Sequence, residues 1–208
     1  MGSRNGTVRW ALSIQGIVAH EQGEFERAQV MLEESLSLAR EVGNKAIIAW
    51  ALINLAETLH SQGKIALATT LLDEGVSLSR AVGNAWVLAP ALHSLGSLAC
   101  AQGDLDRAVA LYRESLRLWL KVGGRRGIAE CLEGLGGLAL GQGDPGRAAR
   151  LYAAAEAIRQ AIGAPRPPRR RAGYYEEVAT IRRDLGEEAF AMAWAEGQAK
   201  GPEQALEQ

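Results

Sequence analysis

The stretch CAQGDLDRAVALY, residues 100–112, decides the fold because its skeleton returns at a fixed distance along the chain. Its Gln-Gly pair stands at 102–103, and the same pair recurs every 40 residues, at 22–23, 62–63 and 142–143. A branched aliphatic residue followed by glycine keeps the same period at 42–43, 82–83, 122–123 and 162–163. A fixed period of this length predicts an array of stacked structural repeats.

Each repeat has the pattern of a helical hairpin. In the quoted stretch Ala108, Leu111 and Tyr112 fall at i, i+3 and i+4, which is one face of a helix. Gly103 is suited to ending the preceding helix, and Asp104 is suited to capping the next one. Such a hairpin cannot bury its apolar face alone, so it must stack on copies of itself.

The sequence therefore predicts an all-α fold, a right-handed superhelical solenoid of four hairpins. Their expected bounds are 1–43, 44–83, 84–123 and 124–163. The next segment, APRPPRRR at 164–171, breaks the period, and its three prolines predict an extended connection. Residues 172–208 are expected to form a helical cap on the last repeat, with helices at 172–185 and 187–196.

Composition and charge argue against several classes of protein. The 208 residues carry 23 Lys and Arg against 24 Asp and Glu, so no basic excess supports non-specific nucleic-acid binding. The apolar runs fall short of the roughly 20 residues that a membrane span needs. Two cysteines on separate predicted helices indicate reduced thiols, and the start of the chain lacks a signal-peptide pattern, so we expect a cytoplasmic protein.

Sequence features that hint at chemistry are better explained by packing. GLGGLA, residues 134–139, imitates a dinucleotide fingerprint, but that motif requires a preceding strand and this one lies within a predicted helix. His20 and His60 occupy equivalent repeat positions without completing a four-ligand zinc set. Phosphate-loop, metalloprotease and nucleophile-elbow motifs are absent from the sequence. We therefore expect a non-catalytic protein with no cofactor and no metal.

The residues at the repeat positions resemble the tetratricopeptide repeat. Leu95-Gly96, Ala108 and Tyr112 match the Leu-Gly, Ala and aromatic positions of that signature, with about six extra residues lengthening the helices. Leu135-Gly136, Ala148 and Tyr152 match it again. A 40-residue period by itself would also suit HEAT or armadillo repeats, so the residue pattern is what favours this family.

The end of the chain is similar to a more specific group of proteins, the bacterial LuxR-type and related signal-transduction ATPase transcriptional regulators. The similarity is to the long tetratricopeptide (maltose-regulator-like) region at their C-terminal end. The similar segments are RAARLYAAAEAIRQAIGAPRPP, residues 147–168, and YYEEVATIRRDLGEEAFAMAWAEGQA, residues 174–199.

This resemblance implies a protein-interaction or signal-sensing module that is a fragment of a longer chain, with the ATPase and the helix-turn-helix elsewhere. The alternative function is a small-molecule sensor that encloses its ligand in the superhelix groove. The implied partner is a protein, a peptide or the rest of the parent chain, and we expect neither direct nucleic-acid binding nor membrane binding.

The family's inward-facing positions on the first helices give the candidate groove residues. They are Trp10, Ser13, Ile17, Trp50, Ile53, Asn54, Glu57, Pro90, His93, Ser97, Glu130 and Glu133. These residues predict a surface that is aromatic at one end and acidic at the other. In the competing interpretation, Trp10 and Trp50 belong to the core between repeats.

Two further surfaces stand out. Arg166, Arg169, Arg170 and Arg171 form a basic cluster, which we interpret as a solvated connection partly neutralised by Glu176 and Glu177. A contact with phosphate or an acidic partner is the alternative. The first hairpin is unusually apolar for a terminal repeat, and a homodimer through it, with a two-fold contact, is expected from Trp10, Leu12, Ile14, Ile17 and Val18.

Overall fold

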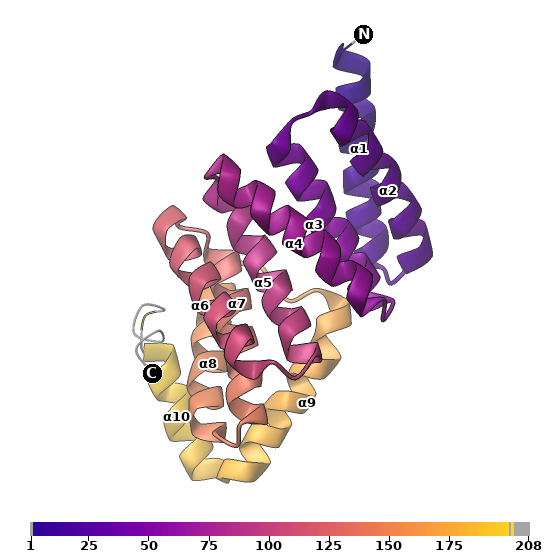
Figure 1. Ribbon diagram of the computed structural model, residues 1–208. Coiled ribbons are helices and arrows are strands. Elements are labelled where there is room, and N and C mark those ends of the chain that lie inside the picture. The colour runs from indigo at the N-terminus through magenta and orange to yellow at the C-terminus, as the bar shows by residue number, and fades with distance from the viewer. Residues whose placement is uncertain (1, 200, 202–208) are drawn as a thin grey trace. The chain divides into compact units, whose positions relative to one another are not determined.

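The computed structural model describes residues 2–199 and 201, and within them the side chains of 10–168, 170–199 and 201. This part of the chain folds into ten α-helices and contains no strand, which confirms the predicted all-α class (Figure 1). The helices are α1 (Gly2–Glu21), α2 (Phe25–Val42), α3 (Lys45–Ser61), α4 (Ile65–Val82), α5 (Ala85–Ala101), α6 (Leu105–Val122), α7 (Arg125–Gly141), α8 (Pro145–Ile162), α9 (Pro168–Leu185) and α10 (Glu187–Ala199). Among the described residues, none of these helices has both the length and the apolar character needed to cross a membrane.

The turns between helices are built as the repeat pattern predicts. Gly103 and Gly43 adopt the left-handed conformation, with φ of 79° and 71°, which a residue with a Cβ rarely adopts. The Asp104 side chain accepts a hydrogen bond from the Arg107 N–H at 3.2 Å. Asn44 accepts two, from the N–H groups of the second and third residues of α3 at 3.0 and 3.3 Å. Short-range chemistry therefore sets the ends of these helices.

The chain divides into two compact units, Met1–Leu98 and Ala99–Gln208, and the boundary lies inside α5. In the first unit α1 packs on α2, α2 on α3, and α3 on α4. Gly16 allows α1 to approach α2 closely, since a Cβ there would lie 2.7 Å from Leu32 Cγ. His20 is a buried packing residue whose Nδ1 lies 3.1 Å from Thr58 Oγ1 on α3.

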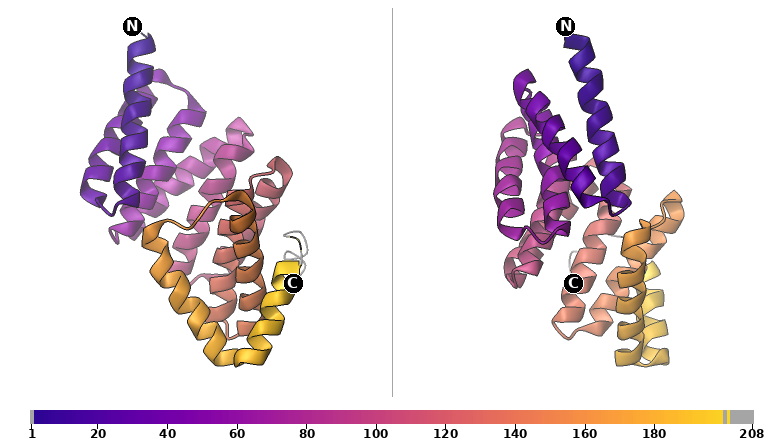
Figure 2. Two further views of the ribbon diagram at one scale, coloured as in Figure 1. Left: turned by 180° about the vertical axis from the view of Figure 1, so that it is seen from behind. Right: turned by 90° about the vertical axis from the view of Figure 1, so that its right-hand side faces the viewer.

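In the second unit α8 lies between other helices, which explains its many alanines. It packs against α7 and also against α9 and α10, which run along it as a V-shaped hairpin (Figure 2). Small buried side chains at Ala149, Ala153 and Ala154 let helices approach α8 on more than one face. The GLGGLA segment lies inside α7, as predicted, and a Cβ at Gly134 would lie 2.7 Å from the Tyr112 ring.

The expected extended connection is four residues too long. Helix α9 begins at Pro168, so residues 168–171 are helical, and the connection from α8 to α9 consists of residues 163–167. The prolines misled the prediction because the first position of a helix has no intrahelical use for its N–H and tolerates proline well. Pro167 stands at the N-cap and Pro168 follows it as the first helical residue.

Candidate functional site

Three tryptophans line an apolar groove in the first unit, which we call the tryptophan groove. Its volume is about 320 Å³, and its walls come from the first helices of the first three repeats. The lining residues are Trp10 and Ser13 from α1, Ala46, Ile47 and Trp50 from α3, and Trp86 and Val87 from α5. None of these residues is charged.

The groove is a direct product of the 40-residue repeat. Trp10 and Trp50 occupy the same repeat position, and the pair Ala46-Ile47 is matched 40 residues later by Trp86-Val87. Equivalent positions on stacked helices face the same side of the array. A short sequence pattern repeated in register therefore gathers the indole rings on one surface.

The tryptophans face solvent to different degrees. The residues Trp10 and Trp86 are 53% and 55% exposed, whereas Trp50 is partly buried. The Ser13 hydroxyl lies 2.6 Å from the Ser35 hydroxyl, so it is engaged in a hydrogen bond with α2. The groove thus presents indole faces and aliphatic groups, with little polar chemistry of its own.

The structure brings three of the candidate residues, Trp10, Ser13 and Trp50, together in this groove. Several of the others have local roles instead. Ile53 is buried in the core, and the Asn54 side chain donates to the Trp50 carbonyl at 2.7 Å. Glu57 accepts a hydrogen bond from the Ser94 hydroxyl at 2.5 Å, which joins α3 to α5.

The remaining candidates of the first unit do not line the groove. Ile17, Pro90, His93 and Ser97 are partly buried. Sequence reasoning missed Ala46, Ile47, Trp86 and Val87, although their 40-residue spacing was a usable signal. They lie in the first turns of α3 and α5, whereas the inward positions carried over from the family lie further along these helices.

The two acidic candidates belong to the second unit, and Glu133 is not an open acidic surface. Its carboxylate accepts hydrogen bonds from Arg159 Nε at 2.6 Å and Nη2 at 2.9 Å, and Arg166 Nη2 lies 2.8 Å away. Glu130 pairs with Arg126 at 3.0 Å, one turn away on the same helix. The Glu133 charge is therefore already matched by two buried arginines, and Glu133 does not present the open acidic surface that the sequence predicts.

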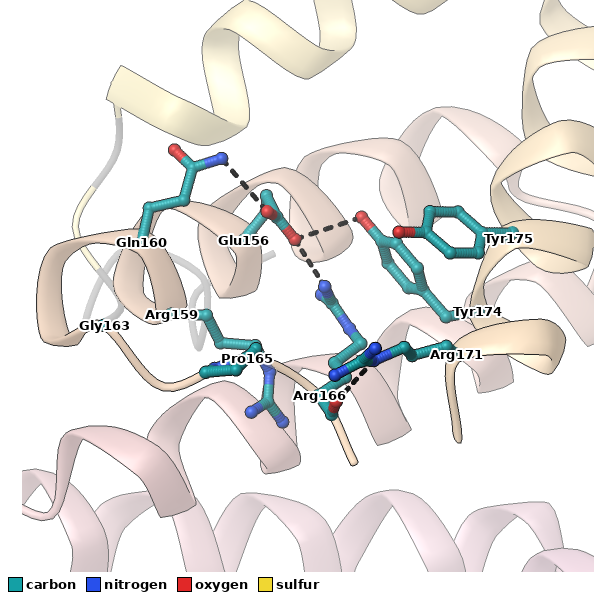
Figure 3. Close-up of a pocket in the computed structure, with 9 residues that line it drawn as sticks. All are labelled: Glu156, Arg159, Gln160, Gly163, Pro165, Arg166, Arg171, Tyr174 and Tyr175. Carbon is teal, nitrogen blue, oxygen red and sulfur yellow. Dashed lines mark hydrogen bonds and ion pairs between the residues drawn. The ribbon is translucent and has the colours of Figure 1, made fainter. Parts of the chain in front are cut away.

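The basic cluster is only partly the solvated connection that the sequence predicts. Arg166 is buried, pairs with Glu156 through Nη1, and places its guanidinium 3.4 Å from the centre of the Tyr174 ring (Figure 3). Arg171 is exposed, and its Nε donates to the Arg166 carbonyl at 2.9 Å. Arg170 is also exposed, and the Arg169 side chain lies outside the described residues.

The carboxylates that neutralise this cluster are not the predicted ones. Glu133 and Glu156 face Arg166, whereas Glu177 accepts a hydrogen bond from the Tyr152 hydroxyl. A cavity of about 460 Å³ lies beside these groups, between α8 and the start of α9 (Figure 3). Because the two buried guanidiniums, those of Arg159 and Arg166, face two carboxylates, this cavity has no buried excess of charge with which to hold an anion.

Burial and pairing shift the protonation equilibria in this cluster. Burial by itself would raise the pKa of Glu156, but the hydrogen bond and charge of Arg166 outweigh it, so the pKa lies below its ordinary value. Burial raises the pKa of Tyr174 to about 12, against an opposing effect of Arg166. The cluster therefore keeps a charged carboxylate beside a neutral phenol near neutral pH.

A family model described as Tetratricopeptide repeat matches residues 7–81 and 87–161. No curated protein matches the chain.

Solved structures share the fold at low sequence identity. BtubC (BKLC) from P. vanneervenii has a TM-score of 0.72 at 20% identity, covering 98% of this chain and 83% of that one. A putative kinesin light chain with nearly identical TPR-like repeats from Podosopora anserina has a TM-score of 0.60 at 17% identity, covering 95% of this chain and 93% of that one. At these identities the likeness concerns the fold alone.

Proposed function

Because the chain belongs to the tetratricopeptide repeat family, we propose that it is a protein-interaction module whose binding site is the tryptophan groove. Repeats of this family generally mediate contacts between proteins and act as non-catalytic scaffolds. The observation that carries the proposal is the set of three tryptophans at one uncharged groove. Tryptophan is one of the residues enriched among those that dominate binding energy at protein interfaces.

The chemistry of the groove defines the kind of peptide that it fits. Its walls hold indole and aliphatic groups without a charged side chain, so a charged residue would lose hydration there without gaining a partner. An aliphatic or aromatic side chain would instead exchange water for close contact with Trp50 and Ile47. We expect the partner to be a peptide segment that inserts one or two apolar side chains between the tryptophans.

The small-molecule sensor is the alternative, and the exposure of the groove makes it the less favoured one. Sites for small molecules usually enclose most of the ligand surface. Here Trp10 and Trp86 each remain more than half exposed, so a small ligand would keep a large face in water. A peptide would leave less of its inserted side chain in water, because the residues on either side of it continue along the protein surface and cover the groove.

We also propose that this module serves a larger ATPase-type transcriptional regulator of the LuxR type, where it contributes to signal transduction. The support for this parent is the similarity of residues 147–168 and 174–199 to the segments that end those regulators. An antibody raised against the purified chain provides the test. A polypeptide much larger than 22.2 kDa in lysates of the source cells is the expected result, and a band only at 22.2 kDa contradicts this parent.

The groove itself is tested by selecting peptides from a random display library on the immobilised chain and measuring their affinity by titration calorimetry. Trp86→Ala should weaken the selected peptides at least tenfold, about 1.4 kcal/mol, as expected of an interface hot spot. Trp86 is the best choice because its exposure limits the effect on folding.

Tyr175→Ala is the matched control, since Tyr175 is a 65% exposed aromatic residue outside the groove. Its affinity for the same peptides should equal that of the wild type. If Trp86→Ala and Trp50→Ala both bind with wild-type affinity while remaining folded, the groove is not the binding site. A small molecule that co-purifies with the wild type in native mass spectrometry and is lost in Trp86→Ala would instead favour the sensor.

A further inference from the structure

A second apolar groove lies in the second unit, between the second half of α8 and the first turn of α7. Its volume is about 360 Å³, and its walls include Arg125 and Ile128 of α7 and Ala157, Ile158 and Ala161 of α8. Arg125 is the one charged residue among the described residues that line it. We call this site the α8 groove.

The α8 groove continues the surface of α8 on which α10 packs. Gly197 of α10 lies against Arg150 and Ala153, since a Cβ built at Gly197 would be 2.2 Å from the Arg150 carbonyl oxygen and 2.8 Å from the Ala153 Cβ. Ala157 and Ala161 follow Arg150 at i+7 and i+11, which places them on the same face of the helix. Helix α10 and the groove therefore occupy successive parts of one face of α8.

The chain leaves α10 in the direction of the α8 groove. Helix α9 begins soon after α8 ends and has 18 residues, a length of about 27 Å, so its far end lies toward the start of α8. Helix α10 starts from that far end and returns beside α8, running in the same direction (Figures 1 and 2). It ends at Ala199, two residues after Gly197, so the chain emerges from α10 just before the groove.

We propose that the α8 groove binds residues 202–208 of the same chain, PEQALEQ, with the Leu206 side chain held in the groove. These residues follow the described part of the chain, and Leu206 is their one large aliphatic residue. Ile128 and Ile158 supply apolar walls against which a leucine side chain would exchange water for close contact. The contact goes beyond the proposed peptide binding, because the tryptophan groove belongs to the first unit.

The length of the segment allows this contact. Ala161, at the far end of the groove, lies about 12 Å along α8 from Ala153, where Gly197 packs. The nine residues from Gly197 to Leu206 can span up to about 30 Å when extended. Leu206 can therefore reach any part of the groove without a change in α10.

Charge and tethering favour this segment over a free partner. Arg125 is exposed at the edge of the groove, and residues 202–208 carry Glu203 and Glu207 but no basic residue. Opposite charges at the edge of an apolar contact favour and orient it. A segment tethered beside its site also has an effective concentration on the order of millimolar, so a peptide from another protein or a second copy must compete with it.

Disulfide cross-linking in the full chain tests where this segment binds. In a Cys100→Ser background, Ala161→Cys combined with Ala205→Cys should form a disulfide within one chain on mild oxidation. The matched control replaces Ala161→Cys by Gln160→Cys, since Gln160 is the exposed neighbour on α8 but lines the cavity beside α9. The control should react roughly tenfold more slowly, because a disulfide needs Cα atoms about 4.4–6.8 Å apart. Cys131 can stay, since burial raises the pKa of its thiol to about 12.

Two results of this experiment would overturn the proposal. Equal rates at positions 160 and 161 would show that residues 202–208 do not bind in the groove. A disulfide between two chains, seen as a doubled mass on a non-reducing gel, would show that the segment of a second copy occupies it instead.

Further substitutions in the chain with cysteines at 161 and 205 test the individual contacts. Leu206→Glu should remove the preference over the control, because a carboxylate would lose hydration in an apolar groove. Arg125→Ala should slow the cross-link about threefold, whereas Arg126→Ala, whose partner is Glu130, should leave the rate unchanged. A rate unaffected by Leu206→Glu or by Arg125→Ala contradicts the proposal. None of these results affects the peptide titrations with Trp86→Ala.

Discussion

Glu133 is the residue on which the buried charges of the second unit depend. Its carboxylate faces Arg159 and Arg166, whose side chains are 3% and 9% exposed. These side chains have little contact with solvent, and removing one member of such a set leaves an unmatched charge in the interior. The side chain is thus part of the interior of this unit, and a variant at this position would change stability before it changed any binding.

We predict that Glu133→Gln lowers the free energy of unfolding by on the order of 3 kcal/mol, because the two arginines lose a shared negative partner. The measurement is urea unfolding followed by circular dichroism. Glu74→Gln is the control at an exposed ion pair. Its partner Arg40 is 53% exposed, so less than about 1 kcal/mol of unfolding free energy should be lost. Equal losses in the two variants would show that burial of the arginines does not matter.

Tyr174 should make the protein sensitive to alkali. Below pH 10 its phenol is neutral in the folded and the unfolded chain, so it adds no pH dependence. Between pH 10 and about 12 the unfolded phenol ionises while the folded one stays protonated, since burial raises its pKa to about 12. Stability therefore falls as the pH rises through this window.

The test compares urea midpoints below pH 10 and within that window for the wild type and Tyr174→Phe. The variant should lose less stability on going to the higher pH, because its ring cannot ionise. Tyr175→Phe, at the exposed neighbouring tyrosine, should follow the wild type. Identical pH dependence in the wild type and Tyr174→Phe would contradict the assignment.

At the scale of the helix, α10 is held by a close approach of two backbones. Gly197 faces Arg150 on α8, and a Cβ at Gly197 would lie 2.2 Å from the Arg150 carbonyl oxygen and 2.7 Å from its Cα. Backbone atoms inside a helix cannot move aside as the end of a flexible side chain can. The glycine is therefore required for α10 to lie at its observed depth.

Gly197→Ala should destabilise the protein by about 1–3 kcal/mol or more, since α10 must shift away from α8. Gly173→Ala on α9 is the matched control, because no atom lies within 4 Å of a Cβ built there. That change should leave stability equal or raise it by about 0.5–1 kcal/mol, as alanine favours the helix. Thermal unfolding monitored by circular dichroism distinguishes the two, and a stable Gly197→Ala would show that α10 is not tightly docked.

At the scale of the whole molecule, the proposed binding site and the buried charge cluster belong to different units. The tryptophan groove lies in the first unit, whereas Glu133, Arg159 and Arg166 lie in the second. Trp86→Ala should therefore change peptide affinity with little effect on stability, and Glu133→Gln should do the reverse.

The sequence by itself determined the helices, because their bounds depend on neighbouring residues. The 40-residue period, the glycines in the left-handed conformation and the caps at Asn44 and Asp104 act within a few residues of one another, so they could be predicted without a structure. The start of α9 was the exception, since a run of prolines suits both an extended segment and the first turn of a helix.

Only the tertiary structure decided which side chains meet. Sequence periodicity placed Trp10 and Trp50 on one surface, but the part that Trp86 plays in the same groove depends on how the first turn of α5 packs. Likewise, Glu133 finds Arg159 and Arg166 only after α7, α8 and the connection to α9 have packed together. Local patterns fix the conformation of each helix, whereas partners far apart in the chain are chosen by the packing of helices, which no single segment encodes.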